Sequence, residues 1–195
     1  MGNCFNTPVA AQIATNINLR DNPKDISSSK IKGTASVSYS FGTWICVNSF
    51  QNNKIITYID ATNHQSVTNL PRFSLVLEDI TENTKSTDKH VLTAFLNINN
   101  QLQPIVITEN VPKEWIYVVM VVNTIYCDCY LNGKLIKSIK IPQNSPQIST
   151  GKSGSIKFGN SDGANGDIIL AKVSLWDYHL KPENVWTEYS SGNGL

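Results

Sequence analysis

The chain has 195 residues with 16 basic and 15 acidic side chains, which give a formal net charge of +1. Because these charges are balanced and spread along the sequence, no basic stripe is available to follow a phosphate backbone, and we expect no nucleic-acid partner. The longest apolar run, Trp115 to Val122, is far shorter than the roughly 20 residues that a transmembrane helix needs. The composition therefore predicts one or two globular domains without a transmembrane segment.

The N-terminal stretch MGNCFNT places Gly2 directly after the first methionine and Cys4 two positions later. This arrangement is similar to the start of proteins that carry an N-myristoyl chain and a neighbouring palmitoyl group. It departs from that pattern at Asn6, where a Ser or Thr is usual. Because one myristoyl chain gives only marginal membrane binding, on the order of 10⁴ M⁻¹, Cys4 would serve as a second anchor. Gly2 and Cys4 are thus lipidation candidates for a lipid-anchored membrane contact, and an unmodified N-terminus is the alternative.

The four cysteines are too few and too irregularly spaced for a disulfide framework in a protein of this length. They are Cys4, Cys46, Cys127 and Cys129. The last two share one face of a predicted strand, where we expect them to pack as small apolar side chains. The N-terminus lacks the pattern of a secretory signal, and no Asn-x-Ser/Thr site occurs. These features predict cytoplasmic synthesis with reduced thiols.

Strand-like alternation begins in the stretch TASVSYSF, in which Ala35, Val37, Tyr39 and Phe41 fall on one face and serines on the other. Further short apolar runs follow at near-regular spacing, separated by clusters of Asn, Gly, Pro, Ser and Asp. This pattern is typical of an all-β, two-sheet antiparallel sandwich. We divide the chain into an N-terminal segment with the first strand (1–29) and a sandwich (30–195), which together form a single domain.

The run WIYVVMVV, residues 115–122, is apolar on both faces of its predicted strand. Only one face of a strand meets the core of a two-sheet sandwich, so the other face requires a cover. A loop, the C-terminal helix or a partner protein would each provide this cover. For the third case, the interface candidates are Trp115, Tyr117 and Met120.

The pair Asn132-Gly133 stands between two alternating runs, residues 125–131 and 134–141. Asn-Gly suits a type I′ turn, because both central residues need a positive φ. The two runs are therefore predicted to form an antiparallel hairpin.

The stretch LKPENVWTEYSSG near the C-terminus has a helical pattern. Pro182 suits the first helical position, apolar residues recur at helical spacing, and Gly192 suits a stop. We predict one short C-terminal helix, laid on a sheet edge.

Two loops at predicted strand ends carry oxygen-rich side chains. They supply the ligand-binding candidates Asp60, Asn63 and His64 in YIDATNH, and Asn160, Asp162, Asn165 and Asp167 in FGNSDGANGD. Such side chains, together with backbone carbonyls, suit a calcium ion, and Asp or Asn beside an aromatic ring suits a sugar. Turns select the same residue types for conformational reasons, so turn formation is the alternative. The spacing does not fit an EF-hand loop, and we assign no metal ligands.

A longer order of motifs carries a resemblance. A tryptophan opens a strand, a Tyr-x-Asn-Gly hairpin follows, an apolar-Gly pair ends the next strand, and a last strand leads to a short helix. The matching residues are Trp44, Trp115, Tyr130, Asn132, Gly133, Phe158, Gly159, Gly166, Ile168, Val173, Trp176, Leu180 and Glu183. Over roughly residues 30–192 the chain resembles the concanavalin A-like lectin and glucanase superfamily, in particular laminin G-like (LamG-type) domains.

The resemblance implies a jelly roll of about twelve strands with a short C-terminal helix. Members of this superfamily bind glycans or protein surfaces, sometimes through a calcium ion at loop ends, and a minority hydrolyse polysaccharides. The chain is also similar to LamG-type proteins of large DNA viruses, which implies a component of a viral particle.

Glycan hydrolases of that superfamily carry acids that alternate along one strand as Glu-x-Asp-x-x-Glu, whereas this chain has no such run. Its nearest acids, Glu78, Asp79 and Glu82, enter a loop, and Asp128 and Asp167 stand alone. Neither a Gly-x-Ser-x-Gly elbow nor a His-Glu-x-x-His helix occurs. We therefore expect no catalytic residues and no enzyme activity.

The favoured hypothesis is a non-catalytic LamG-like recognition or structural module that mediates protein-protein contacts, as a minor capsid or membrane-associated component of a virion. A lectin-type carbohydrate-binding module, assisted by calcium, is the first alternative. A diverged glycoside hydrolase is the second. No cofactor is assigned beyond the calcium of the lectin alternative.

Overall fold

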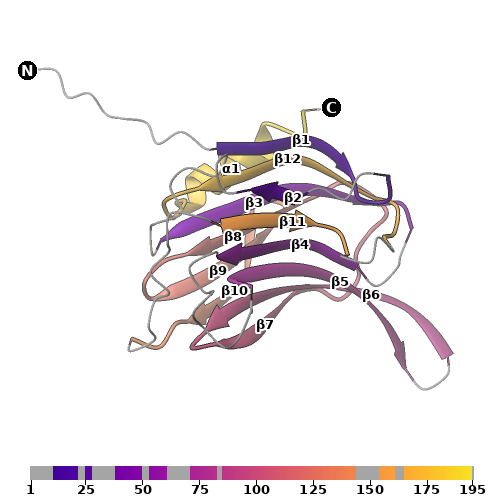
Figure 1. Cartoon of the computed structure of the whole chain (residues 1–195), viewed down its shortest axis with the longest axis horizontal. Helices are drawn as coiled ribbons and strands as arrows, with labels where there is room; N and C mark the ends of the chain where they lie inside the picture. The colour runs from indigo at the N-terminus through magenta and orange to yellow at the C-terminus, as the bar shows by residue number, and fades with distance from the viewer. Residues whose placement is uncertain are drawn as a thin grey trace, which may run out of the picture.

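The computed structural model describes residues 11–21, 25–27, 38–49, 53–60, 71–82, 85–143, 154–160 and 165–194. Within these ranges the chain folds into two six-stranded antiparallel sheets and one short C-terminal helix (Figure 1). The predicted all-β, two-sheet sandwich with a C-terminal helix is confirmed. No helix of the described residues is long and apolar enough to cross a membrane.

The first sheet has the strand order β1-β12-β3-β8-β9-β10, and the second has the order β2-β11-β4-β5-β6-β7. The strands of the first sheet are β1 (Ala11–Asn18), β12 (Ile168–Trp176), β3 (Tyr39–Val47), β8 (Ile116–Val122), β9 (Tyr126–Leu131) and β10 (Lys134–Lys140). The strands of the second are β2 (Asp25–Ser27), β11 (Gly154–Phe158), β4 (Asn53–Asp60), β5 (Phe73–Glu82), β6 (Lys85–Ile98) and β7 (Gln101–Thr108). The first sheet therefore joins strands from both ends of the chain.

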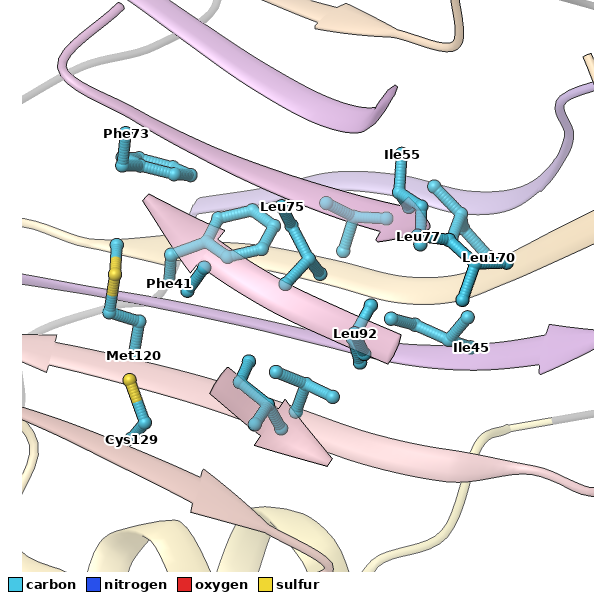
Figure 2. Close-up of a cluster of buried hydrophobic side chains, with 14 of the residues drawn as sticks. Phe41, Ile45, Ile55, Phe73, Leu75, Leu77, Leu92, Met120, Cys129 and Leu170 are labelled. Atoms are coloured by element: carbon cyan, nitrogen blue, oxygen red, sulfur yellow. The ribbon is translucent and has the colours of Figure 1, made fainter. Parts of the chain in front are cut away.

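The core lies between the two sheets and follows the period-two burial that the sequence predicts. Figure 2 shows Phe41, Phe73 and Leu75 packed together, with Met120 and Cys129 close by. The rings of Phe41 and Phe73 have their centroids 5.1 Å apart, which joins the two sheets directly. Met120 is only 3% exposed and belongs to this core.

The predicted Asn-Gly hairpin is confirmed. Asn132 has a φ of 50° and Gly133 a φ of 77°, as a type I′ turn requires. Leu131 pairs with Lys134, so the turn contains only those two residues. The Asn132 side chain extends the role of the turn, because its Oδ1 accepts a hydrogen bond of 2.8 Å from the backbone N–H of Tyr117. The turn is thereby tied to the neighbouring strand β8.

The helix α1 (Pro182–Ser190) begins with Pro182 and ends before Gly192, as predicted. Its position differs from the prediction, because it lies on the outer face of the first sheet rather than on a sheet edge. Val185, which is fully buried, packs against Trp44 of β3 and Tyr117 of β8. Both strands are central in the sheet. The helix and the sheet thus enclose a second apolar cluster outside the main core.

Candidate functional site

The second apolar face of strand β8 is covered by the chain itself. The Trp44 and Tyr189 rings stack with centroids 5.5 Å apart, and the Tyr117 and Tyr189 rings stack at 6.3 Å. Burial first, and the charge of Glu188 second, raise the pKa of Tyr117 well above its usual value. Of the three covers predicted for this face, a loop, the C-terminal helix or a partner protein, the structure has the helix α1.

This cover corrects the predicted interface residues. Tyr117 is 3% exposed beneath α1, and Met120 lies between the sheets, so neither side chain reaches a protein surface. Their predicted interface role is wrong, because strand periodicity shows that both faces are apolar without showing what covers each face. Trp115 is half-buried and packs against the cluster under α1.

Both ends of α1 are anchored to the sheet. Before the helix, Ser40 Oγ donates to the carbonyl of Tyr178 (2.9 Å) and accepts from the N–H of Leu180 (2.8 Å). After it, Lys172 Nζ donates to the carbonyl of Gly192 (2.6 Å) and to Ser191 Oγ (3.1 Å). The last turn of α1 has no basic residue, so the Lys172 ammonium supplies the positive charge that a helix C-terminus favours.

Several large apolar side chains remain exposed near this helix and the β9–β10 hairpin. Six large apolar side chains of the described residues are substantially exposed: Val106 (46%), Ile125 (44%), Tyr126 (44%), Leu135 (54%), Ile136 (38%) and Trp186 (52%). All but Val106 belong to the β9–β10 hairpin, to the residue before it, or to α1. We call these five side chains the hairpin-helix surface.

The hairpin turn brings the two parts of this surface together. A Cβ atom added at Gly133 would lie 2.7 Å from Cε3 of Trp186, so the indole rests on the turn. Leu135 pairs with Tyr130, whose side chain belongs to the cluster under α1, so Leu135 is on the same outer face. Tyr126 pairs with Lys140 at the other end of the hairpin. The Ser138–Asp128 pair lies between these two positions along the hairpin.

Sequence reasoning missed this surface, although two signals were present. Leu135 and Ile136 are consecutive apolar residues that break the alternation of their strand, and the pairing shifts at that point as a bulge. Val185 and Trp186 are adjacent on a helix and so are about 100° apart, which prevents both from facing the sheet.

Two described residues of the second predicted ligand loop, Asn165 and Asp167, accept hydrogen bonds through their side chains. Asn165 Oδ1 accepts a 2.6 Å hydrogen bond from the N–H of Asn160, and it lies 2.7 Å from the position that a Cβ of Gly159 would take. Asp167 Oδ1 accepts from Asn18 Nδ2 at 3.2 Å. These contacts connect the ends of β1, β11 and β12. They give Asn165 and Asp167 a structural role.

The two predicted ligand loops are not adjacent. Asp60 pairs with Gly154 at the start of β11, whereas Asn160 follows Phe158 at the end of that strand. The two ends are roughly 13 Å apart. Asp60 and Asn160 therefore lie at opposite ends of β11.

The remaining candidates, Asn63, His64, Asp162, Gly2 and Cys4, lie outside the described residues. Across the ranges that are described, no three His, Cys, Asp or Glu side chains are grouped as a metal site requires.

The thiols of the described part of the chain are Cys46, Cys127 and Cys129, and all three are free. Cys127 and Cys129 are fully buried in the core. The hydrogen bond between Cys127 and Cys129, and then burial, raise the pKa of Cys127. Both side chains are buried among apolar neighbours, so these two residues pack as core side chains.

Comparison with known proteins connects the fold to binding domains. No protein-family model matches the chain, and neither does any curated protein. Solved structures do. The binding domain of botulinum neurotoxin DC in complex with rat synaptotagmin II is 20% identical, with a TM-score of 0.60 over 86% of this chain and 40% of that one.

Two further structures are similar to the same extent. The neurotoxin DC binding domain in complex with SialylT is 22% identical, with a TM-score of 0.55 over 79% of this chain and 35% of the other. The serotype D binding domain is 16% identical, with a TM-score of 0.60 over 91% of this chain and 43% of the other. The shared feature is the fold. This chain spans less than half the length of each of these domains.

Proposed function

We propose that the chain is a non-catalytic recognition module that binds a partner protein through the hairpin-helix surface. The observation that carries the proposal is the exposure of Leu135 and Trp186 beside the same hairpin turn, since Trp186 lies against Gly133. Exposed apolar groups that gather in a patch are typical of protein interaction sites, and tryptophan and tyrosine are typical of their energetic centres. The similarity to domains described as binding domains supports the same role.

The arrangement of acidic residues supports a role without sugar cleavage. Glu78 is on β5 in the second sheet, whereas Asp128 is on β9 in the first. Asp167 precedes β12, and the strands β3 and β8 lie between β12 and β9. Three strand spacings are roughly 14 Å, which is wider than the separation of a glycosidase carboxylate pair.

The proposal is tested by capture from the cells or particles that produce the protein. The wild type would be compared with Leu135→Ala/Trp186→Ala and with Val106→Ala, an exposed valine outside the surface. Because these side chains are about half exposed, all three proteins should fold equally well. We expect the wild type and Val106→Ala to retain one specific protein and the double variant to lose it by tenfold or more. The proposal would be contradicted if all three proteins retained the same amount of that partner, or if the wild type stayed monomeric and captured no protein.

Glycan binding is the second candidate, because one similar structure is described as a complex with SialylT. The loop that ends at Asp167 is the place for it, since Asn18, Asn160 and Asn165 bring amide groups to the same end of the sandwich. A glycan array with and without calcium tests this candidate. Loss of binding on Asp167→Ala, but not on Asp128→Ala, supports it, and no binding under either condition removes it.

The finer assignment rests on the sequence resemblance alone. We infer a LamG-like component of a viral particle, with lipid attached at Gly2 and Cys4. Detection of the protein in purified particles supports the first part, and its absence there contradicts it. Intact mass of the native protein tests the second, because acylation adds the mass of a fatty acyl chain.

A further inference from the structure

The two elements that carry the hairpin-helix surface have opposite charge. The hairpin, residues 126–140, has three lysines and one aspartate, which give it a net charge of +2. The helix α1 has two glutamates and no basic residue, which give it a net charge of −2. The whole chain has a net charge of only +1, so the two signs are separated between these neighbouring elements.

The register of the hairpin places one of the lysines on the outer face. Lys140 pairs with Tyr126, and Leu135 pairs with Tyr130, whose side chain belongs to the cluster under α1. Tyr126 and Tyr130 are four residues apart on β9 and therefore share a face. Lys140 and Leu135 thus lie on the same outer face, roughly 14 Å apart along the strands.

The other two lysines lie on the core side of the same strand. Lys134 pairs with Leu131 and Lys137 with Cys129, and both of these β9 residues pack against the main core. Neither lysine therefore contacts a molecule that lies on the outer face. Because both are exposed on an edge strand, their charge still adds to the positive potential around the hairpin, over about 10 Å at 0.1 M salt.

On the helix, Glu183 lies on the side that faces the hairpin. It is exposed and precedes Trp186 by three residues, so the two side chains are neighbours on one side of α1. The Trp186 indole rests against the hairpin turn at Gly133. The surface therefore has an acid at the helix and a lysine, Lys140, at the end of the hairpin away from the turn.

The outer face of the first sheet is stepped at this place. The helix α1 packs on β3 and β8, whereas Tyr126 and Leu135 on the next two strands are 44% and 54% exposed. Because a helix with its side chains is roughly 10 Å wide, α1 forms a ridge beside the face of the hairpin. The two parts of the surface differ in height as well as in charge.

A second copy of the chain matches this step in both shape and charge. A dimer with twofold symmetry uses the same patch on both subunits, so the ridge of each subunit can lie on the hairpin face of the other. The negative helix then meets the positive hairpin twice, and Glu183 of each subunit approaches Lys140 of the other. Trp186 and Leu135 supply the apolar contacts.

A partner with charge of one sign matches only half of the surface. An anionic partner would be attracted to Lys140 and repelled by Glu183 and by Asp128, which lies in the same outer row as Tyr126. A cationic partner would be attracted to the helix and repelled by the hairpin. In the twofold arrangement, each element meets the element of opposite charge.

We propose that the partner at the hairpin-helix surface is a second copy of this chain, packed so that α1 of each subunit lies on the β9–β10 hairpin of the other. This inference rests on the proposed function, and it names the partner of the same surface.

Reciprocal charge reversal tests this arrangement. Lys140→Glu and Glu183→Lys each place like charges at both contacts of a dimer, whereas an equimolar mixture of the two variants pairs opposite charges at both contacts. Both side chains are exposed, so the variants should fold as the wild type does. Sedimentation equilibrium at about 50 mM NaCl gives the dissociation constant of each sample.

We expect each single variant to associate about tenfold more weakly than the wild type, and the mixture to return to within about threefold of it. Lys89→Glu, at an exposed lysine on β6 of the second sheet, is the control and should associate as the wild type does.

Each outcome decides the question. A wild type that stays monomeric but captures a different protein leaves the proposed function standing and overturns this inference. A wild type that neither self-associates nor captures a protein removes both. A dimer that forms equally well in every variant uses another surface, and single variants that stay monomeric when mixed show that Lys140 and Glu183 do not face each other. Either of these two results overturns the inference.

Discussion

The docking of α1 onto the sheet can be tested at one residue. Val185 is fully buried in the cluster under the helix, so Val185→Ala removes two methyl groups from a packed site. Transfer alone costs about 1.6 kcal/mol for the two groups. The cavity that remains adds to this, while the higher helix propensity of alanine returns about 0.5 kcal/mol. The expected loss in the free energy of unfolding is roughly 2 kcal/mol, or about 4–8 °C in Tm.

The matched control is Val106→Ala, which makes the same deletion at a valine that is 46% exposed on β7. Urea unfolding followed by circular dichroism gives the free energy of each variant, and we expect the control to lose well under 1 kcal/mol. Hydrogen exchange of the α1 amides should also accelerate in Val185→Ala alone. Equal losses in the two variants would refute the argument that α1 seals the outer apolar face.

Three further predictions concern the same region. Gly133→Ala should lower the free energy of unfolding by about 1–2 kcal/mol or more, because a positive φ is strained for alanine and the new Cβ would meet Trp186. An unchanged urea midpoint would show that the turn accommodates alanine without strain. The pKa of Tyr117 is raised in the folded state, so the stabilisation that its protonated hydroxyl provides is complete below pH 10. Above pH 10 this stabilisation falls by up to about 1.4 kcal/mol per pH unit. The free energy of unfolding should therefore depend less on pH between pH 9 and 11 in Tyr117→Phe than in the wild type. Lys172→Met should cost about 1 kcal/mol and speed amide exchange in the last turn of α1, and unchanged exchange would show that the ammonium does not stabilise that end.

Local rules predicted the parts of the fold that depend on a few neighbouring residues. The turn at Asn132-Gly133 requires two positive φ angles, and that pair of residues is the one best able to adopt them. A second hairpin turn, between β6 and β7, has the same geometry at Asn99 (φ 55°) and Asn100 (φ 60°), but an Asn-Asn pair is a weaker signal for such a turn than Asn-Gly.

Tertiary arrangement decided the parts that local rules left open. Tyr117 and Met120 both lie in an apolar strand, yet one is under α1 and the other is in the core, because the helix position depends on contacts across the whole sheet. Asp60 and Asn160 both belong to oxygen-rich stretches at predicted strand ends, yet strand pairing places them at opposite ends of β11. Trp186 fits the helical pattern, but only the docked helix shows that its ring rests on the hairpin turn.

Hydrogen exchange of the chain, alone and with its captured partner, tests the central claim most directly. Binding through the hairpin-helix surface predicts slower exchange in residues 125–140 and 182–190, and little change in residues 158–167. Protection confined to residues 158–167, with the hairpin and α1 unaffected, would contradict the account and move the binding site to the loop before β12, three strands away from β9 in the first sheet.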